Sequence, residues 1–338
     1  MPIEISPFDP SSASDSDFED FYKVLIAVMA LDHPEQPMLT LEECAKQIRE
    51  PATALGPIKR WAAREEGHIV ATATAKFPAH ENRHLTIVRV IVTPDRRRQG
   101  IGTELLRAML PDLGADGRTV VMANGVKADA SGESWAREMG FVRTHAYVRQ
   151  VLTLSRVDPA LWRCPVPDGF RLEQWAGAAP GILLEEYASA RTAILDAPNG
   201  DSSLEFENWT AERVRTHEAD LHARNVENRV VVAVHEASGR VAGITELELL
   251  SNQPSRGFQQ DTAVAANFRG HGLGLAIKGA MMRWLTADNS AVADIITHTA
   301  YNNTHMIRIN HALGYETTAV VAEIEVGLAE LTKKLESY

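Results

Sequence analysis

One stretch decides the fold of this chain: Val88-Arg89-Val90-Ile91-Val92-Thr93-Pro94-Asp95-Arg96-Arg97-Arg98-Gln99-Gly100-Ile101-Gly102. The chain contains it a second time, as Asp261-Thr262-Ala263-Val264-Ala265-Ala266-Asn267-Phe268-Arg269-Gly270-His271-Gly272-Leu273-Gly274. Each copy has the pattern of a strand, a turn, and Arg-x-x-Gly-x-Gly at the start of an amphipathic helix. Arg97 and Arg269 lie 172 residues apart (269 − 97), which is close to half of the 338 residues. The sequence therefore predicts two copies of one fold.

The motif predicts a site for a phosphate-bearing ligand. The first N–H groups of a helix have no partner within the helix, and the helix dipole favours negative charge at that end. Glycine lets a phosphate approach the backbone closely, and an arginine adds donors in a forked geometry. A Walker loop would end in Gly-Lys-Ser/Thr, and a dinucleotide fingerprint would read G-x-G-x-x-G, so both fit less well. We expect a ligand with a diphosphate.

The rest of the chain follows the same repeat. Short helices end in Gly140-Phe141 and Gly314-Tyr315, 174 residues apart (314 − 140). We expect an N-terminal domain over residues 1–154, closed by a strand pair at 141–154, and a C-terminal domain over 169–338. Residues 155–168 contain three prolines and are expected to form a linker.

The strand followed by [Arg/Gln]-x-x-Gly-x-[Gly/Ala] resembles the coenzyme A motif of the GNAT N-acetyltransferase superfamily. The resemblance covers nearly the whole chain and implies an α/β (α+β) protein with two GNAT folds in tandem, each a mixed, splayed central sheet flanked by helices. It also implies acetyl-CoA as the cofactor and acyl transfer to an amine as the reaction. The positions that match the family's cofactor site are Val90, Ile91, Val92, Arg97, Arg98, Gln99, Gly100, Ile101, Gly102 and Thr103 in the first half. In the second half they are Thr262, Ala263, Val264, Arg269, Gly270, His271, Gly272, Leu273, Gly274, Asn303 and Asn310.

Composition narrows the class of protein. The net charge of −11 argues against a nucleic-acid surface. Two cysteines are too few for a disulfide framework, and the twelve histidines show no metal-ligand spacing, so we expect no metal. Neither a signal peptide nor a membrane span is visible, and we expect a cytoplasmic protein, either a monomer (a pseudo-dimer) or a homodimer.

A general base for the reaction should be a carboxylate near the splayed strands. Glu246 and Glu248 share one face of a predicted strand because strand side chains alternate, and Asp261 begins the second motif strand. In the first half Arg89 stands where Asp261 does, so we expect catalysis in the C-terminal half, with the N-terminal half binding acetyl-CoA structurally or catalytically. The family's acid is a tyrosine four residues before the final glycine, but Asn310 occupies that position here. Tyr301, His311 or Tyr315 could take its place, or the thiolate could leave without an acid.

The acceptor is expected to be a small-molecule amine. The resemblance places its pocket at the loop between the two early helices, where Asp196, Asp201 and Trp209 suit a cation. Two alternatives remain at this point: a non-catalytic acyl-CoA sensor, because the tyrosine is missing, and an acyltransferase that uses an aminoacyl-tRNA donor.

Overall fold

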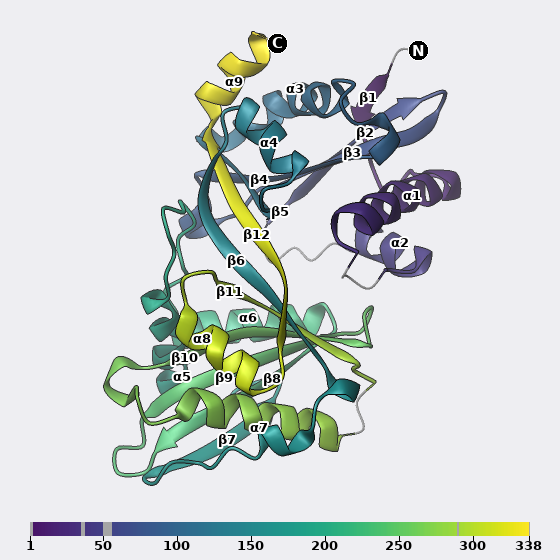
Figure 1. The fold of residues 1–338 in the computed structure, drawn as a ribbon. Coiled ribbons are helices and arrows are strands. Elements are labelled where there is room, and N and C mark those ends of the chain that lie inside the picture. Colours follow the sequence, from purple (N-terminus) through teal and green to yellow (C-terminus); the bar gives the residue numbers. More distant parts are fainter. Residues whose placement is uncertain (1–2, 35–37, 50–55, 289–290, 338) are drawn as a thin grey trace. The chain divides into compact units, whose positions relative to one another are not determined.

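The computed structural model describes residues 3–34, 38–49, 56–288 and 291–337 (Figure 1). The chain divides into two compact units. Unit 1 comprises Met1–Ala146, Gly200–Glu205 and Val320–Tyr338, and unit 2 comprises Tyr147–Asn199 and Phe206–Ala319.

Unit 1 has a mixed sheet in the strand order β1-β2-β3-β4-β5-β12. The pair β4·β5 is parallel, and the other pairs in this order are antiparallel. The strands are β1 (Glu4–Pro7), β2 (Ile58–Glu65), β3 (His68–Lys76), β4 (Leu85–Val92), β5 (Val120–Lys127) and β12 (Glu316–Gly327). The helices are α1 (Asp15–Asp32), α2 (Leu41–Arg49), α3 (Ile101–Leu113), α4 (Ser131–Glu138) and α9 (Leu328–Glu336).

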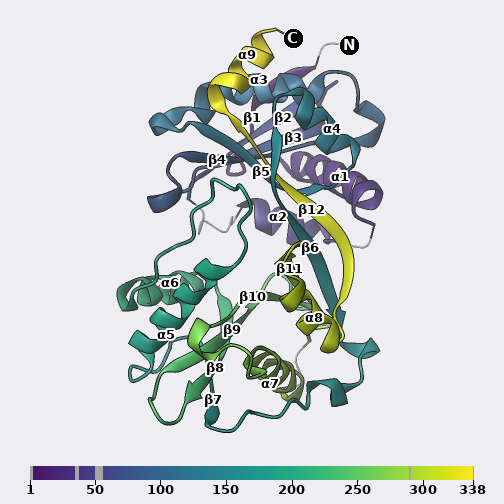
Figure 2. The same cartoon turned by 60° about the vertical axis from the view of Figure 1, so that its left-hand side comes forward.

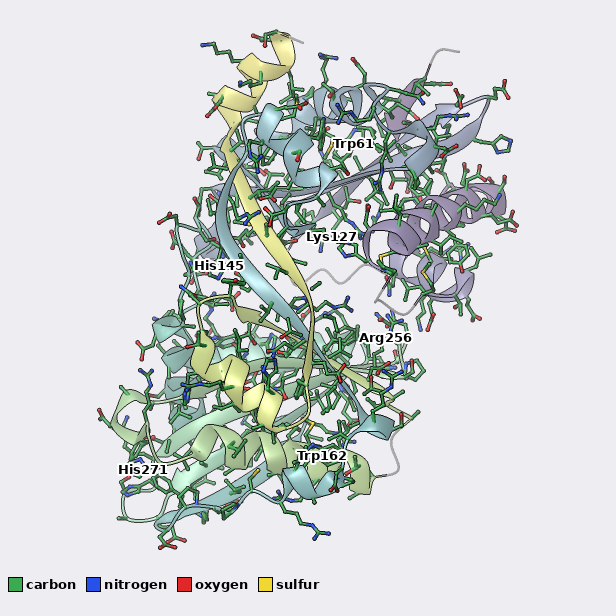
Figure 3. All side chains as sticks on the ribbon, viewed as in Figure 1. Trp61, Lys127, His145, Trp162, Arg256 and His271 are labelled. Carbon is green, nitrogen blue, oxygen red and sulfur yellow. The ribbon has the colours of Figure 1, made fainter. Side chains whose placement is uncertain are left out.

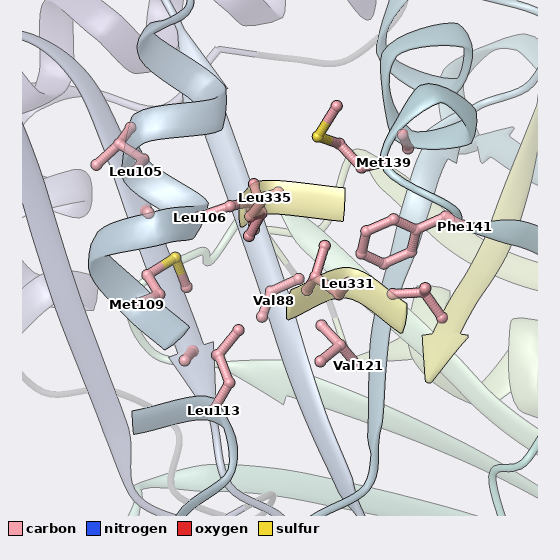
Figure 4. Packing of buried hydrophobic residues seen from close by; sticks show 14 of the residues in the cluster. Val88, Leu105, Leu106, Met109, Leu113, Val121, Met139, Phe141, Leu331 and Leu335 are labelled. Atoms are coloured by element: carbon pink, nitrogen blue, oxygen red, sulfur yellow. The ribbon is translucent and has the colours of Figure 1, made fainter. Parts of the chain in front are cut away.

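The two faces of this sheet are covered by different helices. On one face, Val88 and Val121 of the sheet meet Leu105, Leu106 and Met109 of α3 and Leu331 of α9 (Figure 4). On the other face, Phe18 and Phe21 of α1 and Cys44 of α2 pack against Ala62 and Ile69. The period-two pattern of the strands, with apolar residues on both faces, accounts for this three-layered arrangement.

Unit 2 repeats the plan in the strand order β6-β11-β10-β9-β8-β7, with β10·β11 as its parallel pair. Its strands are β6 (Val142–Thr153, from Tyr147 onward), β7 (Phe170–Ala176), β8 (Val226–His235), β9 (Val241–Leu250), β10 (Arg256–Val264) and β11 (Asp294–Ala300). The helices are α5 (Leu184–Arg191), α6 (Ala211–Ala223), α7 (Leu273–Ala287) and α8 (Thr304–Ala312), and the 3-10 helix η7 (Thr192–Asp196) continues α5.

Alternate residues of β8 show the two faces of the second sheet. Val231 and Ala233 pack with Leu273 and Ile277 of α7, whereas Val230 and Val232 pack with Tyr187 of α5 and Val214 of α6. Figure 2 shows α5 and α6 on one side of these strands and α7 on the other. The α5/α6 side is the side on which the candidate acids lie, as described below.

The closing strands differ from the expectation. Residues 142–153 form one strand instead of a strand pair, because the stretch contains no glycine, proline, asparagine or aspartate that would turn the chain. The part of β6 from Tyr147 onward pairs with β11 in unit 2, and β12 pairs with β5 in unit 1. The compact units are therefore not the contiguous halves 1–154 and 169–338.

The expected linker is also part of a unit. Residues 154–156 and 159–162 form short 3-10 helices. Trp162 is fully buried in the unit 2 core, where its indole Nε1–H donates to the Leu313 carbonyl at 3.0 Å. Figure 3 labels Trp61 in unit 1 and Trp162 in unit 2, each among the side chains of its own core. Across the residues that the structure describes, no helix combines the length and apolar character needed to cross a membrane.

Candidate active site

The two glycine-rich loops have the same conformation. In each, the motif strand leads through a single 3-10 turn (Pro94–Arg96 or Ala266–Phe268) to a glycine that caps the following helix. Gly100 has φ +82° and Gly272 has φ +81°, a region that disfavours side chains, and open space lies where a Cβ would be. The first hydrogen bonds into the helices come from Glu104 N–H to the Gly100 carbonyl and from Ala276 N–H to the Gly272 carbonyl. The N–H groups of residues 101–103 and 273–275 precede them, as an anion cradle requires.

The motif arginines hold the loops together. The Nε–H of Arg97 donates to the Val92 carbonyl at 3.2 Å, and that of Arg269 donates to the Val264 carbonyl at 3.0 Å. The rest of each guanidinium binds an acid at the end of an early helical segment, α1 in unit 1 and η7 in unit 2. Arg97 binds both oxygens of Asp32 at 3.0 and 2.6 Å, and Arg269 binds Asp196 at 2.5 Å. The Asp196 carboxylate is therefore engaged by the glycine-rich loop of unit 2, and its role in an acceptor pocket stays a prediction.

The second glycine of each motif serves helix packing. A Cβ on Gly102 would lie 3.2 Å from the indole of Trp135 on α4, and one on Gly274 would lie 3.2 Å from Ile309 Cδ1 on α8. The backbone of Arg98 has φ +63°, where its counterpart Gly270 has φ +83°. His271, labelled in Figure 3 in the loop before α7, has its ring beside Phe170, with centroids 5.9 Å apart. Gly102 and Gly274 thus have a packing role, and their predicted contact with a phosphate stays a prediction.

Each parallel strand pair separates after three paired residues. In unit 1, β4 and β5 pair only at residues 85–87 and 120–122. In unit 2, β10 and β11 pair only at residues 256–258 and 294–296. Beyond these points, the predicted cofactor positions Val90, Ile91 and Val92, and likewise Thr262, Ala263 and Val264, lie in strands that are paired on their other side only. Such a separation leaves backbone groups that an extended ligand can bind.

Glu246 is the most buried of the three candidate acids, at 2% exposure, and both of its oxygens have partners. Tyr187 OH donates to Oε1 at 2.5 Å, and Arg191 Nη2 lies 3.1 Å from Oε2. Burial raises the pKa of Glu246 to about 7, against the opposing charge of Arg191. Because its lone pairs are engaged, Glu246 is better placed to hold Arg191 and Tyr187 than to accept a substrate proton.

Glu248 and Asp261 are half-buried, and within the described parts of the chain neither carboxylate has a hydrogen bond or ion pair. Burial raises the pKa of both, and Arg191 counteracts this. A β-bulge places Asp261, because Gln260 and Asp261 on β10 together oppose the single residue Glu246 on β9. The register of β3 with β4 continues without such a shift, so only unit 2 has a bulge at this place among the strand pairs compared.

Arg191 is the site residue that sequence reasoning missed. Its guanidinium carbon lies 3.3 Å from the ring centroid of Trp209, which had been predicted as a substrate residue, and the side chain is almost fully buried between that ring and Glu246. One face of Trp209 is thus covered by Arg191. The only signal in the sequence was an arginine at the last turn of a helix, a position typical of many surface arginines.

The other predicted site residues lie elsewhere. Tyr315 is buried in the core of unit 2 with its hydroxyl 4.0 Å from Met282 Sδ, and burial raises its pKa further, so it is unsuited to donate a proton to a ligand. Asn310 is fully buried and donates to Gln150 and Thr299 at 2.8 and 3.2 Å. Asn303 caps α8 by accepting from Met306 N–H at 3.1 Å. Asp201 belongs to unit 1, where its N–H donates to the Thr144 carbonyl.

Comparison with known proteins agrees with this geometry. A sequence model of the acetyltransferase (GNAT) family matches the chain twice, over residues 19–141 and 192–315, which reproduces the predicted repeat. The chain is 26% identical over 284 residues to the mycothiol acetyltransferase of Nocardia farcinica, covering 78% of this chain and 85% of that protein. It is 24% identical over 239 residues to the mycothiol acetyltransferase of Mycobacterium avium, covering 69% and 72%.

Solved structures show the same fold. The tandem GNAT protein from the clavulanic acid biosynthesis pathway superposes with a TM-score of 0.77 at 24% identity, over 97% of this chain and 99% of that one. A GCN5-related N-acetyltransferase from Sphaerobacter thermophilus superposes with a TM-score of 0.71 at 17% identity, over 96% of each chain.

Proposed function

The chain belongs to the acetyltransferase (GNAT) family and is a tandem GNAT acetyltransferase, and from this premise we propose that it transfers an acetyl group from acetyl-CoA to the amine of a small molecule in unit 2. The observation that carries the assignment to unit 2 is a pair of half-buried carboxylates, Glu248 and Asp261, beside the point where β10 and β11 separate. Neither has a hydrogen-bond or ion-pair partner among the residues that the structure describes.

The loops and strands fit acetyl-CoA. The N–H groups at the start of α7, next to Gly272, would hold the diphosphate, and the free edge of residues 262–264 would hold the pantetheine arm. When bound, acetyl-CoA supplies an activated thioester. The same parts of unit 1, at the start of α3 and at residues 90–92, are proposed to bind a second acetyl-CoA.

Asp261 and Glu248 are proposed to receive the acceptor as an ammonium and to take a proton from it, which leaves a neutral, nucleophilic amine. Desolvation supports this role because a carboxylate with a raised pKa is a stronger base in its ionised form. Asn310 cannot donate a proton as a tyrosine does, and its amide is engaged in the core. We propose that no side-chain acid acts in unit 2.

Thiol release from acetyl-CoA, measured with a panel of alkylamines, amino sugars and amino-acid amides, tests the proposal. Asp261→Asn should lower kcat/KM by about 100-fold or more, the range for loss of a general base. Glu212→Gln removes an exposed carboxylate from α6 and serves as the control, with no expected effect. Equal activity of Asp261→Asn, Glu248→Gln and the wild type would exclude this base and, with it, the assignment to unit 2.

A further inference from the structure

Unit 1 carries three cations at the place where unit 2 carries acids. Arg60 on β2 pairs with Thr74 on β3, and Thr74 pairs with Arg89 on β4, so the side chains of this row project from one face of the sheet. Lys76 is the next residue of β3 on the same face. We call Arg60, Lys76 and Arg89 the cation row.

The cation row lies between two apolar clusters on the same face. Toward one end of the strands, Ala62, Ile69 and Ile91 pack under α1 and α2. Toward the other, Leu85, Ile87 and Met122 pack with Leu204. Leu204 comes from the segment Gly200–Glu205, which Glu325 holds by accepting from Ser203 N–H at 2.8 Å and Ser203 Oγ–H at 2.5 Å. The row therefore lies between these two clusters on one face of the sheet.

The described parts of the chain offer these three charges no partner. Among the described residues, no side chain makes a hydrogen bond or ion pair to Arg60, Lys76 or Arg89. Burial lowers the pKa of each, and the other two cations lower that of Lys76 further. Arg89 nevertheless has an exposed surface, so a ligand in solution could reach its guanidinium. Cys44 of α2 is the titratable group that faces it.

The two motifs are 172 residues apart, and the same offset matches two residues of the cation row with the two acids of unit 2. Lys76 corresponds to Glu248 (248 − 172 = 76) and Arg89 to Asp261 (261 − 172 = 89), so the sign of the charge is reversed at both. The pairing of the first two strands agrees, because Glu246 lies opposite Val230 as Thr74 lies opposite Arg60. Asp261 lies in the β10 bulge opposite Glu246, whereas Arg89 pairs with Thr74 in an unbroken register. A place built this way repels an ammonium and attracts an anion.

We propose that the cation row of unit 1 binds a small molecule that carries at least two negative charges as carboxylate or phosphate. The fork of an arginine matches either group with two hydrogen bonds, and such a ligand supplies the counter-charges that the row lacks. Arg89 of the cation row lies on β4 just before the cofactor positions Val90–92. The anion could therefore come from two sources: a free dianion, or the charged end of an acyl chain carried on coenzyme A. This site is separate from the amine site proposed in unit 2.

Calorimetric titration of the full chain with succinate, inorganic phosphate, succinyl-CoA and acetyl-CoA tests the proposal. Saturable binding of succinate or phosphate identifies a free anion as the ligand. Succinyl-CoA binding at least tenfold tighter than acetyl-CoA, with no binding of the free anions, identifies an acyl chain. In either case Lys76→Met should weaken binding of that ligand roughly tenfold or more, as expected for the loss of a charge-assisted contact.

Lys59→Met is the matched control, because Lys59 is an exposed lysine on β2 that projects from the opposite face and pairs with Asp112. It removes the same charge and should leave the affinity unchanged. The proposal would be overturned if Lys76→Met and Lys59→Met weakened binding of the anionic ligand equally. It would also be overturned if no titration showed a preference for a dianionic ligand. Arg89→Met gives a second test, and thermal melts of both variants establish that unit 1 remains folded.

Discussion

At the level of single residues, Lys278 stands where the first copy of the fold has an apolar side chain. The motif offset pairs it with Leu106 (278 − 172 = 106), and both are buried in the helix that follows the glycine loop. The ammonium nitrogen of Lys278 lies 5.2 Å from the ring centroid of Tyr315. Burial lowers its pKa to about 7. Folding must either bury this ammonium or remove its proton, so the lysine reduces stability at any pH at which it is charged in the unfolded chain.

We therefore expect Lys278→Met to stabilise unit 2 in a pH-dependent way. The unfolded chain holds this proton up to about pH 10, whereas the folded chain loses it near pH 7, so wild-type stability rises with pH between these values. The variant should gain on the order of 4 kcal/mol at pH 7, and the gain should shrink toward pH 10. Urea unfolding at pH 7 and 9.5 measures it. Lys333→Met, at an exposed position, is the control, and a gain that is independent of pH would contradict the explanation.

Arg191 offers a second test at this level, because its charge lowers the pKa of all three acids near it. Replacing it by glutamine should move the acidic limb of the kcat/KM profile upward by about one pH unit and leave the high-pH plateau largely intact. A purely structural role would lower the plateau without moving the limb. Arg240→Gln, at an exposed arginine 3.6 Å from Glu186, should leave the profile unchanged.

At the level of elements, the sequence predicts most strands and helices well because their patterns are local. The sequence pattern predicts strands over residues 85–92 and 241–250 and a helix over residues 101–113, and β4, β9 and α3 have these bounds. The β10 bulge is different, because it consists of two residues facing one residue of another strand, and no spacing within β10 reveals its partner. The acids Glu248 and Asp261 could be named from the sequence, but the engagement of Glu246 by Tyr187 and Arg191 could not.

The second glycine of each motif gives a prediction about packing between helices. Gly102→Ala should destabilise unit 1 by roughly 1 kcal/mol, because the new Cβ would press on Trp135, whose indole N–H is held by Thr103 at 3.3 Å. Gly274→Ala should be neutral or slightly stabilising, because the flexible end of Ile309 can move and alanine favours a helix by about 0.5–1 kcal/mol. Thermal melts of the two variants measure the difference. Equal losses would mean that both glycines are needed for their backbone alone.

At the level of the whole molecule, the sequence does not predict which sheet each of the two closing strands, β6 and β12, joins. The strands β6 and β12 have the same length of 12 residues, and each follows a short helix that ends in Gly-aromatic, so the local pattern fits either sheet. The compact units take β12 and α9 into unit 1 and the second part of β6 into unit 2. Pairing between residues this far apart in the chain is decided by the assembled sheets and not by any one segment.

A fragment of residues 1–154 should therefore fail to fold, although it holds a complete family motif. It lacks β12, whose residues 321–327 pair with β5, and α9, whose Leu331 and Leu335 fill the core beside Met109 and Leu113. Without them, one edge of β5 and the apolar side of α3 are exposed. Adding residues 320–338 through a flexible linker should restore a cooperative thermal transition and dispersed amide signals in the NMR spectrum, because it returns the missing strand and helix. A cooperative transition in the 1–154 fragment alone would show that β6 can close its own sheet, and the exchange would then be one of two stable pairings.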